Sequence, residues 1–154
     1  MSLVLLKHSL YVPSCAEIID QIFSKLDTPK NIFQNIRLSN QNTNDLIKKS
    51  SISAVSFTGS TNAGMLVAQT SGAALKKVVL ELGGNDPYLI FSDAKVDNAV
   101  QSCVEGRLLN AGQSCISAKR IIVLDDIYEK FLEKIVKNLK QKTVGDPISN
   151  IDMG

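Results

Sequence analysis

The chain has 154 residues, with 17 Lys and Arg against 15 Asp and Glu, a single His and a formal net charge of +2. Its length suits one ordinary domain that buries about 70% of its unfolded surface. The balanced charge argues against nucleic acid as a partner, and no window reaches the roughly 18 apolar residues that a membrane span needs. We therefore expect a cytoplasmic chain with neither a nucleic-acid nor a membrane partner.

Hydrophobic periodicity predicts alternating strands and helices. In the first half these are a strand over 3–6, a helix opened by Pro13, a weak strand over 32–38, a short helix over 44–49, a strand over 54–57, a helix over 65–74 that Gly72 breaks, and a strand over 78–80. After the turn Asn85-Asp86-Pro87, the second half gives a strand over 88–91, a helix over 96–109, a strand over 121–124 and a helix over 127–139.

This alternation implies a mostly parallel sheet with helices on its faces, so the expected fold class is α/β. The segment from Gly83 to Pro87 is the one place where composition suggests a break between two halves. In the last helix, Asp126 with Glu129 resembles a capping box, which would fix where that helix begins.

Three cysteines at wide spacing fit neither a disulfide framework nor a paired metal site, and no metal is expected. Cys15 and Cys103 fall on predicted helices, where a lone Cys is usually a small buried apolar residue. We expect both to be buried. Cys115 differs, because it follows Gly112-Gln113-Ser114.

Two further segments have residue types suited to chemistry. Phe57 to Gly64 lies between a predicted strand and a predicted helix, where glycines can expose backbone N–H groups to a phosphate, although a bare strand-to-helix turn explains this segment equally well on its own. Leu80-Glu81-Leu82-Gly83-Gly84 places a carboxylate beside two glycines. Taken alone, Glu81 would more often be a solvated strand end, but an acid and a thiol together are the base and nucleophile of covalent catalysis.

The three segments occur together and in order, as Phe-Thr-Gly-Ser-x-x-x-Gly, Leu-Glu-Leu-Gly-Gly and Gly-Gln-x-Cys. In this the chain resembles the aldehyde dehydrogenase superfamily, and it is most similar to the succinate-semialdehyde branch. The resemblance implies that Cys115 attacks an aldehyde and that Glu81 activates water, a role that suits a partly buried carboxylate able to move.

The resemblance also implies a cofactor, NAD or NADP. Gly59 and Ser60 would contact its phosphates and Lys7 its adenosine ribose, with Gly64 and Leu82 completing the cofactor site. The chain departs from the family at the third position after Lys7: NAD-preferring members often have Glu there, and this chain has Leu10. Loss of that carboxylate removes repulsion against a 2′-phosphate, so both cofactors remain open.

Family members are far longer, so the resemblance makes the chain a middle piece. Residues 1–84 would be a partial dinucleotide-binding domain with a partial doubly wound parallel sheet, and residues 85–154 the start of the α/β catalytic domain. One function is oxidation of a small aldehyde, with isolated activity absent or very low. The alternative is a non-catalytic remnant that binds a dinucleotide weakly, forms an oligomer or associates with the missing segments.

Overall fold

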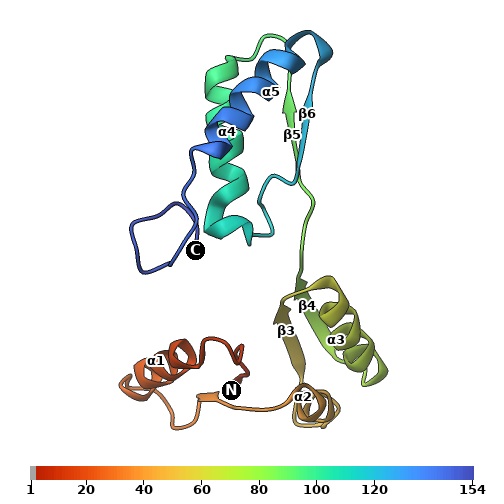
Figure 1. Ribbon diagram of the computed structural model, residues 1–154. Coiled ribbons are helices and arrows are strands. Elements are labelled where there is room, and N and C mark those ends of the chain that lie inside the picture. The colour runs from red at the N-terminus through yellow and green to blue at the C-terminus, as the bar shows by residue number, and fades with distance from the viewer. Residues whose placement is uncertain (1–2) are drawn as a thin grey trace. The chain divides into compact units, whose positions relative to one another are not determined.

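The computed structural model describes residues 3–154, and their contacts divide the chain into two compact units (Figure 1). One unit runs to Phe57 and resumes over Asn62–Leu80, and the other combines Thr58–Thr61 with Glu81–Gly154. The assignment of 1–84 and 85–154 to cofactor and catalytic domains stays a prediction.

The first half of the chain alternates strands and helices as expected. Its elements are β1 (Val4–Leu6), α1 (Pro13–Ser24), β2 (Phe33–Asn35), α2 (Asn40–Ile47), β3 (Ala54–Thr58), α3 (Thr61–Ala73) and β4 (Lys77–Glu81). β1 pairs with β2 in parallel, and β3 pairs with β4. In the β1–β2 pair, Leu6 lies opposite Asn35, so both strands end at the same edge.

The second half forms the best-packed part of the structure. Its elements are β5 (Pro87–Ile90), α4 (Val96–Leu108), a 3₁₀ turn η1 (Leu109–Gly112), β6 (Arg120–Val123) and α5 (Asp125–Lys140). β5 and β6 pair in parallel, and α4 and α5 lie beside them (Figure 1). Ile90, Val100, Phe131 and Ile135 meet in the buried cluster that joins strands and helices. These parallel pairs flanked by helices confirm the α/β fold class.

Several element boundaries differ from the sequence prediction, and three of these differences concern how a helix begins or continues. α2 begins earlier, at Asn40, because the hydroxyl of Ser39 accepts a hydrogen bond from the Asn42 N–H at 3.1 Å and caps the helix. α3 continues through Gly72 to Ala73, so that glycine does not break it. The capping box at Asp126 is wrong: Leu124 is the N-cap of α5, and Asp126 lies within the first helical turn, where the helix dipole favours a carboxylate.

One face of the β5–β6 pair is uncovered within residues 3–154. Side chains alternate along a strand, so the residues that do not join the helices point to the opposite face. Leu89 on β5 is 55% exposed, and Phe91 directly after β5 is 57% exposed. Ile122 on β6 is 49% exposed, and Leu124 directly after β6 is 44% exposed. Among the described residues, none of the helices has the length and apolar character to cross a bilayer.

Candidate functional site

The backbone just before Cys115 passes through a left-handed stretch. Asn110, Ala111 and Gly112 have φ angles of 52°, 55° and 74°, three left-handed residues in succession. Asn and Gly tolerate this region, whereas for Ala111 it costs about 1–2 kcal/mol. A β carbon at Gly112 would also lie 2.7 Å from Nη1 of Arg107, which donates to the Gly112 carbonyl at 3.3 Å. Strain of this kind is typical of functional loops.

The segment after Glu81 lies against the segment that contains Cys115. A β carbon on Gly84 would be 2.8 Å from the Cys115 carbonyl oxygen, so only glycine permits this approach. The Lys119 ammonium donates to the Gly84 carbonyl. Arg120 donates through Nε to the Asn85 carbonyl at 3.1 Å. These polar contacts hold the two segments side by side.

The backbone of Glu81 joins its strand to the glycine-rich turn. The Gly59 N–H donates to the Glu81 carbonyl at 3.0 Å. The side chains of Glu81 and Cys115 are both exposed, so the expected partial burial of Glu81 is wrong for this chain. No hydrogen bond joins the carboxylate to the thiol among residues 3–154. The structure therefore brings their segments together while leaving both reactive groups accessible.

The turn after β3 has the features of a phosphate site. α3 begins at Thr61, directly after Ser60, and the positive end of a helix dipole favours an anion at such an N-terminus. Gly64 is buried in that turn, and Leu82 is half-buried just after β4. The Gly59 N–H already donates to the Glu81 carbonyl. Gly59 would therefore contribute to a phosphate site by having no side chain that blocks the phosphate.

A second cofactor-related feature lies where β1 and β2 end. Lys7 follows β1 directly and is half-buried. His8 and Arg37 line a hollow of about 170 Å³ at this edge. The Nδ1 atom of His8 is buried without a hydrogen-bond partner in the described residues, and Arg37 pairs with Glu17. Ligands of α/β proteins bind at the carboxyl ends of the strands, so these residue types fit an anionic dinucleotide.

The predicted site residues fall in both units. Lys7 and Gly64 belong to the first unit, and the remaining five, Gly59, Ser60, Glu81, Leu82 and Cys115, belong to the second. Sequence reasoning missed Arg37, Lys119 and Arg120. The available signal was a basic residue within the predicted strand 32–38, for Arg37, or just before the predicted strand 121–124, for Lys119 and Arg120.

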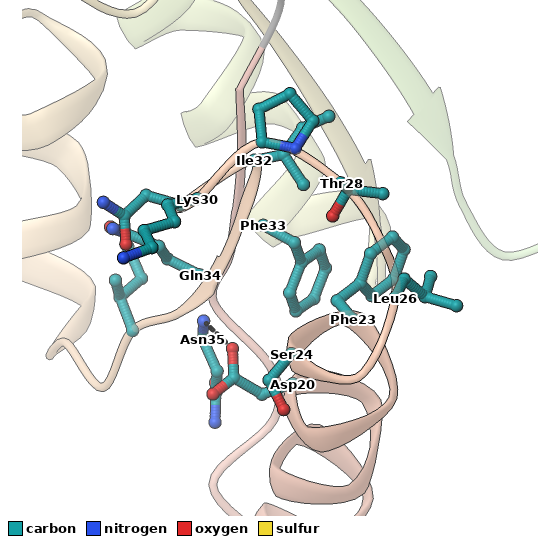
Figure 2. A pocket seen from close by; sticks show the side chains of 13 residues that line it. Asp20, Phe23, Ser24, Leu26, Thr28, Lys30, Ile32, Phe33, Gln34 and Asn35 are labelled. Atoms are coloured by element: carbon teal, nitrogen blue, oxygen red, sulfur yellow. Dashed lines mark hydrogen bonds between the residues drawn. The ribbon is translucent and has the colours of Figure 1, made fainter.

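A larger hollow of about 480 Å³ is lined by none of the predicted site residues (Figure 2). It lies between the end of α1, the loop that follows and β2. The Phe23 and Phe33 rings stack there with centroids 4.4 Å apart and planes 8° from parallel. Asp20 accepts a hydrogen bond from the Asn35 N–H at 3.2 Å. These contacts attach α1 to β2.

The other two cysteines differ from each other. Cys103 is fully buried, as predicted, and burial raises the pKa of its thiol. Cys15 is exposed, so its predicted burial is wrong: the residue that α1 buries is its neighbour Ala16. Residues 3–154 bring together no group of three or more His, Cys, Asp or Glu side chains that could bind a metal ion.

Parallel strand pairs flanked by helices, with a strand–glycine turn–helix segment, define an α/β protein with features of a dinucleotide-binding fold. The model of the aldehyde dehydrogenase family matches residues 2–154. The chain belongs to the aldehyde dehydrogenase family.

Curated relatives are similar over nearly the whole chain. It is 41% identical over 143 residues to the NAD(P)+-dependent succinate semialdehyde dehydrogenase Sad of Escherichia coli, covering 93% of this chain and 31% of that protein. It is 40% identical over 151 residues to a probable NADP+-dependent succinate-semialdehyde dehydrogenase of Synechocystis, covering 97% and 33%. The chain thus spans about a third of the length of these relatives.

Solved structures agree in fold. The succinic semialdehyde dehydrogenase of Streptococcus pyogenes, solved with NADP+, has a TM-score of 0.87 at 33% identity, covering 96% of this chain and 33% of that chain. A lactaldehyde dehydrogenase of Escherichia coli has a TM-score of 0.93 at 29% identity, covering 99% and 32%.

Proposed function

We propose that this chain supplies the nucleophile, the base and cofactor-binding residues of an NAD(P)-dependent aldehyde dehydrogenase that oxidises succinate semialdehyde. The observation that carries this proposal is the backbone approach of Gly84 to Cys115, because it places the Glu81 segment beside the Cys115 segment. Relatives named for succinate semialdehyde support the choice of substrate.

The chemistry follows from the two exposed side chains. The Cys115 thiolate forms a bond to the aldehyde carbon, and the resulting oxyanion accepts a hydrogen bond from the Cys115 backbone N–H. Loss of hydride from that carbon leaves a thioester. Glu81 removes a proton from water as the water attacks the thioester, and the carbon–sulfur bond breaks to release the acid and restore the thiolate.

NAD(P), when bound, would supply the hydride acceptor. Ser60 and the first turn of α3 would hold its phosphates, with Gly59 and Gly64 leaving room for them. Lys7 would contact the adenosine ribose, and Leu82 would complete the cofactor site. In this proposal residues 1–84 bind the cofactor and residues 85–154 carry the nucleophile.

A non-catalytic, partner-docking role remains the second candidate, and the uncovered face of the β5–β6 pair favours it. A parallel sheet is normally covered on both faces, so this face requires another element or chain. For the same reason we expect no aldehyde-dependent NAD(P)H formation from the 154 residues alone.

A chimera separates the two candidates. The matched third of the Escherichia coli relative is replaced by this chain, and NAD(P)H formation with succinate semialdehyde is measured. We expect activity that Cys115→Ser abolishes and that Cys15→Ser, at a second exposed thiol, leaves unchanged. A folded chimera that binds cofactor but never turns over, or one whose activity survives Cys115→Ser, would contradict the proposed function.

Glu81→Gln tests the role of the base in the same chimera. Hydride transfer does not need Glu81, whereas thioester hydrolysis does. We therefore expect one rapid equivalent of NAD(P)H per site followed by steady turnover reduced by about 10²–10⁴-fold. Loss of the first equivalent as well would assign Glu81 to an earlier step.

A further inference from the structure

The hollow between the end of α1 and the loop that leads into β2 lies wholly within the first unit (Figure 2). Its volume of about 480 Å³ falls within the roughly 300–1,000 Å³ of pockets that hold a small molecule. Two turns fold the loop around it. The Thr28 N–H donates to the Leu26 carbonyl at 2.9 Å. The Ile32 N–H donates to the Pro29 carbonyl at 3.3 Å.

Aromatic and aliphatic side chains form the apolar wall of this hollow. The Phe23 and Phe33 rings stack with their centroids 4.4 Å apart. Phe23 is nevertheless 37% exposed, and Leu26 is 50% exposed. Because the stack uses only one face of the Phe23 ring, the rest of that ring is open to a ligand. Such a wall suits a flat apolar group, and an aromatic face also attracts a positive charge.

The Asp20 carboxylate gives the hollow a negative charge. Its Oδ1 atom accepts the Asn35 N–H at 3.2 Å, and its Oδ2 atom has no partner within residues 3–154. Asp20 is half-buried, and none of the ion pairs in that part of the chain includes it. A carboxylate oxygen that has lost part of its water is costly without a donor. A positively charged donor would satisfy Oδ2 with a charge-assisted hydrogen bond.

The other charged groups nearby do not replace that donor. Lys30 also lines the hollow, but its side chain is exposed, so its repulsion of a bound cation is screened by water and salt. Glu17, one turn before Asp20 on α1, is paired with Arg37. Asp27 is exposed in the loop and does not line the hollow. Asp20 is therefore the carboxylate that a bound cation would meet.

We propose that this hollow binds a small organic cation in which an ammonium or amidinium group is attached to a flat apolar body. The cationic group donates to Oδ2 of Asp20, while the apolar body lies against Phe23 and Leu26. None of the residues assigned above to NAD(P) or to the aldehyde lines this hollow, so the site goes beyond the proposed function. Because Oδ1 of Asp20 accepts the Asn35 N–H, a cation on Oδ2 also changes the surroundings of that amide.

Protein NMR of the 154-residue chain with benzamidine and with benzamide tests this proposal. The two probes have nearly the same shape, but only benzamidine is charged at neutral pH. We expect benzamidine to shift the Asn35 amide resonance in a saturable way. Benzamide should bind at least about tenfold more weakly, as loss of a charge-assisted hydrogen bond predicts. Addition of NADP should leave the binding of benzamidine unchanged.

Three variants locate the binding of the probes. Asp20→Asn keeps an acceptor for the Asn35 N–H but removes the charge, so it should lower the affinity for benzamidine to that for benzamide. Phe23→Leu should weaken the binding of both probes. Asp27→Asn is the matched control, because it removes a negative charge from the same loop outside the hollow and should leave both affinities unchanged.

Shifts that do not saturate, or equal affinity of the unaltered chain for the two probes, would overturn the inference, and this comparison holds even if Asp20→Asn does not fold. Equal weakening by Asp20→Asn and Asp27→Asn would overturn it as well, because the probe would then respond to overall charge. Displacement of benzamidine by NADP would assign the probe to the cofactor site and overturn it too. None of these results bears on the proposed roles of Cys115 and Glu81.

Discussion

Gly84 and Cys115 lie in backbone contact: a β carbon at Gly84 would be 2.8 Å from the Cys115 carbonyl oxygen and 3.3 Å from Oδ1 of Asp86. The backbone at Cys115 cannot move away from an added β carbon as easily as a flexible side chain could. The position of the segment after Glu81 therefore depends on glycine at position 84, which has no β carbon. It also depends on the strained turn that precedes Cys115.

Gly84→Ala should displace the Cys115 segment. Overpacking against backbone destabilises by about 1–3 kcal/mol, and we expect a lower midpoint of urea unfolding together with shifted amide resonances at Cys115 and its neighbours. Gly72→Ala is the control: nothing lies within 4 Å of its β carbon inside α3, so it should stabilise by about 0.5–1 kcal/mol. An unchanged Cys115 amide in Gly84→Ala would show that the loops adjust without cost.

The sequence is sufficient to predict the α/β class and most element positions, because apolar periodicity marks buried faces. It is also sufficient to single out Glu81 and Cys115, because their neighbours form recognisable motifs. The start of α2 was missed because it depends on the Ser39 cap rather than on periodicity. Lys119 was missed because its partner is a carbonyl in a distant segment, a relationship that only the folded backbone reveals.

The burial of Cys103 predicts selective alkylation. The fully buried thiol has a raised pKa, so it stays protonated and unreactive at neutral pH, whereas Cys15 and Cys115 are exposed. Iodoacetamide at pH 7 should label those two in the native chain and reach Cys103 only after unfolding. Peptide mass spectrometry measures the three rates separately. Labelling of Cys103 as fast as Cys15 would mean that α4 is not packed as described.

The hydrogen bonds of Asp152 predict that the loop near the end of the chain loses stability in acid. Hydrogen bonds from the Thr143 N–H, from Lys142 and from the Thr143 hydroxyl hold the pKa of this carboxyl at about 2, below its ordinary 3.8. A depressed pKa stabilises the loop above pH 3.8, and that contribution is lost as the pH falls through about 2. Carbon-detected NMR should give a midpoint near 2, and a midpoint near 3.8 would refute the contacts.

Asp152→Asn provides the companion experiment. The amide can still accept the Thr143 N–H but has no charge for Lys142 to pair with. We expect faster hydrogen exchange at Thr143 and at Met153, whose N–H donates to the Thr143 carbonyl at 3.0 Å. Asp146→Asn, at an exposed carboxylate whose Oδ1 accepts the Ile148 N–H, should leave that exchange unchanged.

The uncovered face of the β5–β6 pair predicts binding of an apolar dye. Leu89 and Ile122 are paired across the strands and are 55% and 49% exposed, so together they form a continuous apolar surface. The 154-residue chain should bind anilinonaphthalene sulfonate, and Leu89→Thr with Ile122→Thr should weaken that binding while changing stability by less than about 0.5 kcal/mol per site. Ile148→Thr is the control, because Ile148 is 94% exposed in a separate loop and lies outside this surface. If the chain instead melts cooperatively as a compact monomer and binds no dye, this face is covered in solution. Association with further segments would then have no physical basis.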